Sequence, residues 1–253
     1  MKMTESQKLE CKIKREFFME IVEIFNSNDK AAIINKLDQI RDKKENGDKF
    51  SITNVVLTKI LSNPDLNKNL FFELIYLTGT EYTYEYSKQY PSGILSNNRI
   101  NMLNALFDSI LSIKEIIYVF FNTRLRNEIT VDHLMDYAMQ KRGISAENFI
   151  SLLSGYWFYG KVRYITEDGF LRIIPYSFGT TRLPGTKGNI FHISQSDGTY
   201  RTAEIGDCVY FKFKSYNLSN SMFSIHYLCS DPKIIEQKWL DKSNDKYKTS
   251  VII

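Results

Sequence analysis

Basic and aromatic side chains alternate with apolar ones over residues 160–173, and a shorter run of the same kind follows at residues 190–193. Phe170 and Arg172 lie two residues apart, so in a β-strand they share one face. His192 belongs to the second run. Aromatic rings can stack on nucleobases, and cationic side chains can hold phosphates. These residue types therefore indicate contact with a nucleic acid.

Motifs that carry catalytic chemistry are missing from the sequence. It has no Gly-rich phosphate loop, no G-x-S-x-G and no H-E-x-x-H. The three histidines are far apart in sequence, which argues against a histidine-based metal site. Cys11, Cys208 and Cys229 show no C-x-x-C spacing, which is typical of a reducing compartment. We therefore expect a cytoplasmic protein that is not an enzyme and uses no cofactor or metal.

Composition is that of a soluble globular protein. The 253 residues are 43% hydrophobic and 25% charged, with a formal net charge of +4. This charge permits a polyanionic partner without requiring one. The first twenty residues are rich in Lys and Glu, unlike a signal peptide. The most hydrophobic stretch, residues 100–121, contains Asp108, Lys114 and Glu115, so it predicts a buried helix and no membrane span.

Residues 1–153 carry helical patterning without an internal repeat. Ser51 or Thr53, Thr130 and Ser145 are residue types that begin helices, and Gly143 is a helix breaker. The triplet at 63–65, Asn-Pro-Asp, also predicts a helix start. The helices that these signals predict lie at residues 6–26, 29–44, 51–62, 63–78, 99–121, 130–140 and 145–153.

Two helices have apolar stripes that predict their buried faces. For the first helix, the residues expected to face inward are Ile13, Phe17, Phe18, Ile21, Val22, Ile24 and Phe25. For the second, they are Ile33, Ile34, Leu37 and Ile40. His133, early in the helix that follows Thr130, is expected to be a packed or surface residue with no catalytic role.

From Gly155 the pattern changes to short alternating runs rich in Tyr, Phe, Val and Ile. Val209, Phe211 and Phe213 are expected to form an apolar face, and Tyr210, Lys212 and Lys214 the outward one. We predict an α+β multidomain protein, with an all-α domain followed by a small five-stranded OB-like β-barrel. The predicted parts are residues 1–153 (helical domain), 154–230 (barrel) and 231–253 (a short helix and a polar tail).

Residues 156–230 resemble the cold-shock domain family, which holds single-stranded nucleic acid against an aromatic face. The segments that carry the resemblance are GKVRY (160–164), DGFLRI (168–173), GNIFHIS (188–194), GTYRT (198–202) and GDCVYF (206–211). Members of the family have two motifs, roughly K-G-F-G-F-I and V-F-V-H-F. The resemblance covers under a third of the chain.

The resemblance implies a binding site. Phe170 matches the first stacking Phe, His192 the motif His, and Tyr164 the aromatic residue after the opening Gly-Lys-Val. Lys161 and Arg163 would contact phosphates.

The segment also departs from the family pattern. Arg172 stands where a second stacking Phe would be, and Ile190 and Ile193 replace other motif aromatics. A guanidinium group can stack on bases and attract phosphates as well. The longer loop at 175–187 adds four candidate contacts, which are Tyr176, Phe178, Arg182 and Lys187. Residues 156–230 hold eight Lys or Arg and five Asp or Glu, a modest positive excess.

The sequence therefore predicts binding of single-stranded nucleic acid, RNA in preference to DNA, with the helical domain mediating partner binding or self-association. Two alternatives remain open. One is a protein-interaction scaffold whose barrel no longer binds nucleic acid. The other is a duplex-DNA regulator that uses the helix-turn-helix outline of residues 130–153. The second helix of that outline contains no Lys or Arg to hold phosphates.

Overall fold

The computed structural model describes residues 4–48, 51–79 and 96–153, together with Tyr156, five strand segments between 158 and 229, and the single residues Glu167 and Ile205. The strands are described through their backbone pairing. The expected helix after residue 231 and the Tyr-rich stretch at 79–98 lie outside the described residues, except for 79 and 96–98.

Helices make up 76% of the part of the chain whose side chains are described. They are α1 (Glu5–Ser27), α2 (Lys30–Glu45), α3 (Asn54–Leu61), α4 (Lys68–Thr78), α6 (Asn97–Asp108), α7 (Ile113–Asn122), α8 (Val131–Arg142) and α9 (Ala146–Leu152), with a 3₁₀ turn, η1 (Arg124–Asn127).

Local capping explains most helix ends. The Asp29 carboxylate accepts hydrogen bonds from the backbone N–H groups of Ala31 and Ala32, at 3.0 and 3.1 Å. Thr53 accepts one from the N–H of Val56, which confirms Thr53 as the start of α3. Gly143 ends α8 in the left-handed region, with φ of 64°, as the sequence predicts.

Two predicted helix boundaries are wrong. The helix expected from Asn63 begins only after Asn67, because the Asn63 amide donates to the carbonyl of Phe25 and to Asn28. The stretch 99–121 is two helices rather than one. Ser112 and Glu115 form a reciprocal capping box that begins α7, with bonds of 2.6 and 3.3 Å.

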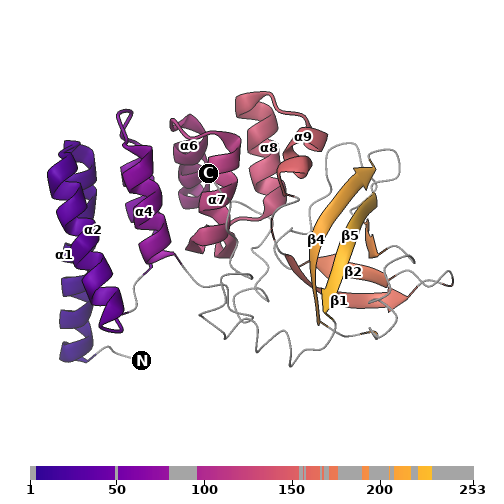
Figure 1. The fold of residues 1–253 in the computed structure, drawn as a ribbon, viewed down its shortest axis with the longest axis horizontal. Helices are drawn as coiled ribbons and strands as arrows, with labels where there is room; N and C mark the ends of the chain where they lie inside the picture. Colours follow the sequence, from indigo (N-terminus) through magenta and orange to yellow (C-terminus); the bar gives the residue numbers. More distant parts are fainter. Residues whose placement is uncertain are drawn as a thin grey trace.

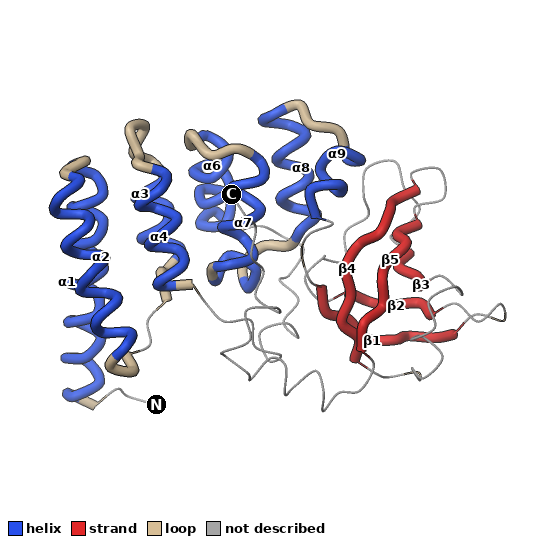
Figure 2. Tube along the Cα trace, in the orientation of Figure 1, coloured by secondary structure: helices blue, strands red, loops and turns tan. Residues whose placement is uncertain are grey.

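The helices stack as antiparallel pairs in a row (Figure 1). The pairs are α1 with α2, α3 with α4, α6 with α7 and α8 with α9, and they follow one another along the long axis (Figure 2). Contacts join α1 to α3, α3 to α6 and α6 to α8 in one layer, and α2 to α4 and α4 to α7 in the other. Each pair therefore packs mainly on its neighbours, an arrangement of repeat proteins, although the sequence does not repeat.

The core runs between these two layers. Phe25, Phe71, Phe107, Phe120 and Phe149 are fully buried in it. The aromatic ring of Tyr156, which follows α9, is also buried and stacks on Phe121, with ring centroids 4.4 Å apart.

Two residues of the predicted inner faces are exposed instead. Ile13 is 56% exposed, because residues 4–16 of α1 lie clear of the other described residues. Ile34 is 40% exposed, while Lys36 is almost fully buried. The Lys36 ammonium lies 4.5 Å from the centre of the Phe17 ring and 2.5 Å from a Glu20 carboxylate oxygen, and these contacts compensate the burial of its charge.

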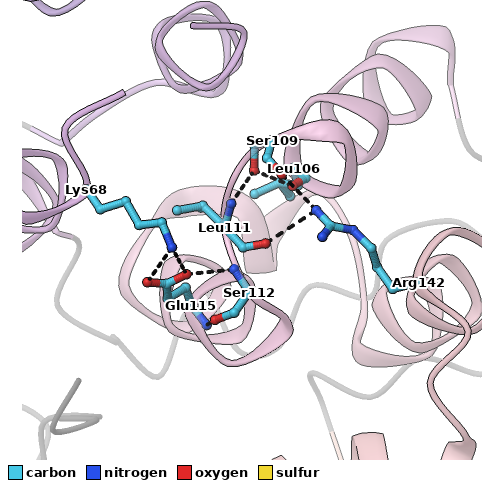
Figure 3. A network of polar contacts seen from close by, with 7 residues as sticks. All are labelled: Lys68, Leu106, Ser109, Leu111, Ser112, Glu115 and Arg142. Carbon is cyan, nitrogen blue, oxygen red and sulfur yellow. Dashed lines mark hydrogen bonds and ion pairs between the residues drawn. The ribbon is translucent and has the colours of Figure 1, made fainter. Parts of the chain in front are cut away.

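A polar network joins four helices near the middle of the array (Figure 3). The Lys68 ammonium of α4 lies 3.0 Å from the Glu115 carboxylate of α7. Arg142 of α8 donates to the backbone carbonyls of Phe107, Ser109 and Leu111, at 2.7, 2.8 and 3.3 Å. These carbonyls belong to the end of α6 and the α6–α7 connection, so Arg142 ties that connection to α8.

Five strands follow the helices. They are β1 (Phe158–Ile165), β2 (Leu171–Pro175), β3 (Ile190–Ile193), β4 (Cys208–Asn217) and β5 (Met222–Cys229). Their order is β1-β2-β3-β5-β4, and pairing of β1 with β4 closes the sheet. All pairs are antiparallel except β3 with β5. The sheet lies beside α9, which contacts β4 (Figure 1).

The predicted fold class needs correction. We expected an α+β protein, yet the part of the chain whose side chains are described, essentially residues 4–48, 51–79 and 96–153, contains eight α-helices and no strand. This part of the chain is therefore all-α, not α+β. The five strands are described by backbone, so the alternating side-chain core on which the OB-like barrel prediction relied is not part of this description. Alternation in a sequence indicates strands but not how their side chains pack together, so it did not establish the predicted OB-like barrel.

Candidate nucleic-acid interface

Five residues, one from each strand, pair in a continuous line across the sheet. Tyr164 of β1 pairs with Arg172 of β2, and Arg172 pairs with His192 of β3. His192 pairs with Ser224 of β5, which pairs with Ser215 of β4. Directly paired residues occupy the same face of a sheet. We call these five positions the polar row.

The lines of residues on either side of the polar row are apolar or aromatic. One contains Val162, Ile173, Phe191, Phe223 and Tyr216, and the other pairs Ile165 with Leu171 and joins Ile193 to Ile225 and Phe213. Successive residues of a strand alternate between faces, so both lines belong to the opposite face. The register therefore separates an apolar face from a face with polar positions.

Two more pairs belong to the same face as the polar row. Lys161 pairs with Ile174, which lies two residues from Arg172. Lys212 pairs with His226, which lies two residues from Ser224. We call this side of the sheet the polar face. Its polar positions are Lys161, Tyr164, Arg172, His192, Lys212, Ser215, Ser224 and His226, and the apolar Ile174 lies among them.

Irregularities in the strand pairing involve two further basic residues, Arg163 and Lys214. The register shifts between Val162 and Tyr164, so Arg163 is an extra residue there. It shifts again between Phe213 and Ser215, with Lys214 as the extra residue. Lys214 was expected to continue the outward alternation of β4; Ser215 takes that position instead.

The strands are positively charged. They contain five Lys or Arg and no Asp or Glu. The five acidic residues of 156–230 all lie in the connections between strands. A phosphate chain that follows the sheet would therefore meet cationic positions from the strands themselves.

The structure brings three of the sequence-predicted site residues, Tyr164, Arg172 and His192, into direct pairing. Lys161 lies on the same face and Arg163 at the shift in β1. The remaining predicted contacts, Phe170, Tyr176, Phe178, Arg182 and Lys187, lie outside the described residues.

Sequence reasoning missed Ser215, Ser224 and His226. They belong to the polar face only because β3 pairs with β5, and because β4 shifts register before Ser215. No local signal in the sequence states which strands pair. The absence of acidic residues from β4 and β5 was a signal that could have drawn attention to these strands.

A buried polar cluster lies at the start of α8. Thr130, Asp132 and His133 are all nearly inaccessible to solvent. His133 Nδ1 accepts a hydrogen bond from the backbone N–H of Thr130, at 3.2 Å, so it is unprotonated in this arrangement. One Asp132 carboxylate oxygen accepts from the Thr130 hydroxyl and the His133 N–H, while the other has no hydrogen-bond partner. His133 is thus a packed residue, as expected.

Burial shifts the pKa values of His133 and of Asp136, which lies three residues further along α8. It lowers the pKa of His133, against the opposing effect of the Asp132 and Asp136 carboxylates. Burial also raises the pKa of Asp136, and the nearby Asp132 charge adds to that rise. Arg99, which lies 3.4 Å from Glu128, further disfavours a charged His133. The hydrogen bonds begin a helix, so we assign the cluster a structural role.

The described residues contain no group of three or more His, Cys, Asp or Glu arranged to hold a metal ion. None of the helices described is both long enough and apolar enough to cross a bilayer. No family model, no curated protein and no solved structure matches this chain.

Proposed function

We propose that the chain binds single-stranded nucleic acid on the polar face, RNA in preference to DNA, without catalysing a reaction. The observation that carries this proposal is the direct pairing of Tyr164, Arg172 and His192 on three neighbouring strands. An aromatic, a guanidinium and an imidazole group are the residue types that stack on bases and hold phosphates. Neighbouring strands lie about 4.8 Å apart, so these positions span about 10 Å.

Charge supports the same function. Lys161, Arg163 and Arg172 belong to strands without any acidic residue. Each phosphate neutralised on a single strand changes the slope of log affinity against log salt by about −0.7. If these three residues hold phosphates, the slope is about −2. Binding should therefore weaken steeply as salt is added.

A reducing compartment, the cytoplasm, suits this proposal. The three cysteines are far apart in sequence, and Cys11 is an exposed free thiol. Isolated free cysteines are typical of proteins in reducing compartments.

The first test is fluorescence anisotropy with labelled single-stranded RNA, single-stranded DNA and duplex DNA, each at two salt concentrations. We expect binding of the single strands, strongest for RNA and weakened by salt. A preference for duplex DNA would instead support recognition through α8 and α9. No binding to any of the three would contradict the proposed function.

Tyr164→Ala tests the stacking position. Stacking of a base on an aromatic residue contributes about 1–3 kcal/mol, so we expect affinity for single-stranded RNA to fall about 5- to 140-fold. Tyr76→Ala is the matched control, because Tyr76 is an exposed tyrosine on α4, 64% accessible to solvent and remote from the sheet in the helical row (Figure 1). Equal loss of affinity in both variants would remove Tyr164 from the interface.

Protein binding is a second candidate function, and the stacking of the helix pairs favours it. Rows of helix pairs that pack mainly on their neighbours present long continuous surfaces, which repeat proteins use to hold partners. In this proposal the helical row binds a protein partner or a second copy of the chain, with or without nucleic acid on the sheet. Light scattering of the purified chain over a range of concentrations would detect self-association.

A further inference from the structure

The polar face continues past the residues that carry the proposed function. From His192 of β3 the polar row passes to Ser224 of β5 and Ser215 of β4. The next line on this face pairs Lys212 of β4 with His226 of β5. These four positions on β4 and β5 extend the face across the two strands that the site predicted from the sequence left out.

We propose that a bound single strand crosses from β3 onto β5 and β4, where Lys212 takes a phosphate and Ser224 contacts the sugar of RNA. This inference rests on the proposed function and adds a second half to the same interface. The juxtaposition that supports it is the unbroken register from Tyr164 through Arg172 and His192 to Ser224.

The two halves of the face differ in chemistry. The β1–β3 half offers an aromatic residue in the polar row, Tyr164, beside Arg172 and His192. On β4 and β5 the polar row holds Ser215 and Ser224, and the line that pairs Lys212 with His226 adds two more polar positions. The aromatic position of this face of β4 is Tyr210, two residues before Lys212 and outside these two lines. Hydroxyl, imidazole and ammonium groups can hydrogen-bond to sugar and phosphate oxygens. The second half therefore suits the backbone of the strand, and the first half suits its bases.

Charge continues across both halves. β4 contributes Lys212 and Lys214, and neither β4 nor β5 contains an acidic residue. A phosphate chain leaving Arg172 and His192 would thus meet further cationic positions and no carboxylate on these strands. This continuity favours a nucleic acid as the occupant of β4 and β5.

The serine positions also bear on the preference for RNA. A 2′-hydroxyl both donates and accepts hydrogen bonds, and it is the group by which a protein distinguishes RNA from DNA at a given site. Serine hydroxyls can serve as its partners. Ser224 lies next to His192 in the polar row, so it is the first such position that a strand would meet after leaving β3.

Lys212→Gln is the direct test. The measurement is the affinity of the full chain for a labelled single-stranded RNA of about twelve nucleotides, long enough for the site sizes of comparable sheets, over a series of salt concentrations. We expect the slope of log affinity against log salt to become shallower by about 0.7. Lys212→Arg should keep the wild-type slope, because it keeps the charge. Lys30→Gln, an exposed residue on α2, should leave the slope unchanged.

Ser224→Ala tests the sugar contact independently. We expect weaker binding of RNA with unchanged binding of DNA of the same sequence, so that the ratio of the two affinities falls. An unchanged ratio would remove Ser224 from the inference. Thermal unfolding of each variant shows whether the fold is intact. Lys212→Arg keeps the positive charge, so it separates the loss of charge at position 212 from the change of side chain.

Arg172→Gln separates failure of this inference from failure of the proposed function. If the wild-type chain binds no single strand, both fail. If it binds, and Arg172→Gln makes the slope shallower while Lys212→Gln leaves it unchanged, the strand stays on β1–β3. That result would overturn the inference and keep the function.

Discussion

At the scale of single residues, His133 shows how one buried imidazole supports a helix start. Its Nδ1 accepts the Thr130 N–H, which has no partner within the helix. Protonation would turn this acceptor into a donor and break the bond. Neutral His133 is therefore the form that the fold stabilises, in agreement with its lowered pKa.

The free energy of unfolding should depend on the protonation of His133. The unfolded chain takes up the proton near the ordinary pKa of 6.5, whereas the folded chain takes it up at lower pH. Between these two pKa values the unfolded state binds more protons, so stability falls as pH is lowered below about 6.5. His133→Gln, whose amide oxygen can still accept the Thr130 N–H, should lose this dependence. Urea unfolding at several pH values measures it.

Asp136 acts in the opposite direction and must be separated from His133. Its pKa is raised in the folded state, so the folded chain binds more protons between pH 3.8 and that raised pKa, and stability rises as pH falls through this interval. Asp136→Asn removes this contribution and leaves that of His133. If Asp136→Asn, rather than His133→Gln, abolished the loss of stability below pH 6.5, the account of His133 would be wrong.

Residue types predicted local features well where the interaction is short-range. Thr53, Gly143 and Ser145 have the roles that their types indicate, because a cap needs only residues within one turn. Lys36 shows the limit. Its burial depends on Phe17 and Glu20 of another helix, and no local pattern announces such a contact.

At the scale of elements, Arg142 fixes the connection between α6 and α7. Its guanidinium group donates to the backbone carbonyls of Phe107, Ser109 and Leu111, and Figure 3 shows the bonds to Ser109 and Leu111. We expect Arg142→Met to lower the free energy of unfolding by about 1–3 kcal/mol, because partly buried carbonyls lose their donors. Chemical denaturation of the variant and the wild type measures this difference.

Lys141→Met is the matched control on the same helix turn. Lys141 pairs with Asp108 at 3.0 Å, but both side chains are exposed, by 39% and 59%. Exposed ion pairs contribute about 0–1 kcal/mol, so this variant should be close to the wild type. A larger loss for Lys141→Met than for Arg142→Met would contradict the role given to Arg142.

Element boundaries were predicted less well than element types. The sequence signal at 63–65 was a plausible helix start, yet Asn63 instead bonds to the end of α1, and α4 begins at Lys68. The break at 109–112 went unnoticed because Ser112 and Glu115 form a capping box inside a hydrophobic stretch. A tertiary hydrogen bond therefore decided the first boundary, and a local capping box decided the second.

At the scale of the whole molecule, stacked helix pairs occur without a repeated sequence. Each pair needs only an apolar face toward its neighbours, and many different residues satisfy that condition. The sequence alone therefore could not show that the helix pairs stack in a row. The polar face was likewise only partly predictable, since alternation indicates which residues share a strand face but not which strands pair.

The sheet and the helical row carry different charge patterns. Helices α1, α2 and α4 hold ion pairs such as Lys14 with Glu10 and Lys36 with Glu20, in which cations are neutralised by neighbouring acids. The strands have cations without acids. A polyanion should therefore prefer the sheet, although the net charge of the chain is only +4.

Photo-crosslinking of bound single-stranded RNA, followed by mass spectrometry of the linked peptides, tests the central claim most directly. The polar face predicts crosslinks in β1, β2 and β3, with Tyr164 and His192 among the linked residues. It also predicts that added salt removes these crosslinks, because phosphate contacts contribute to binding. Crosslinks confined to the helical row would contradict the account. So would the absence of any crosslink when RNA is present in excess over the protein.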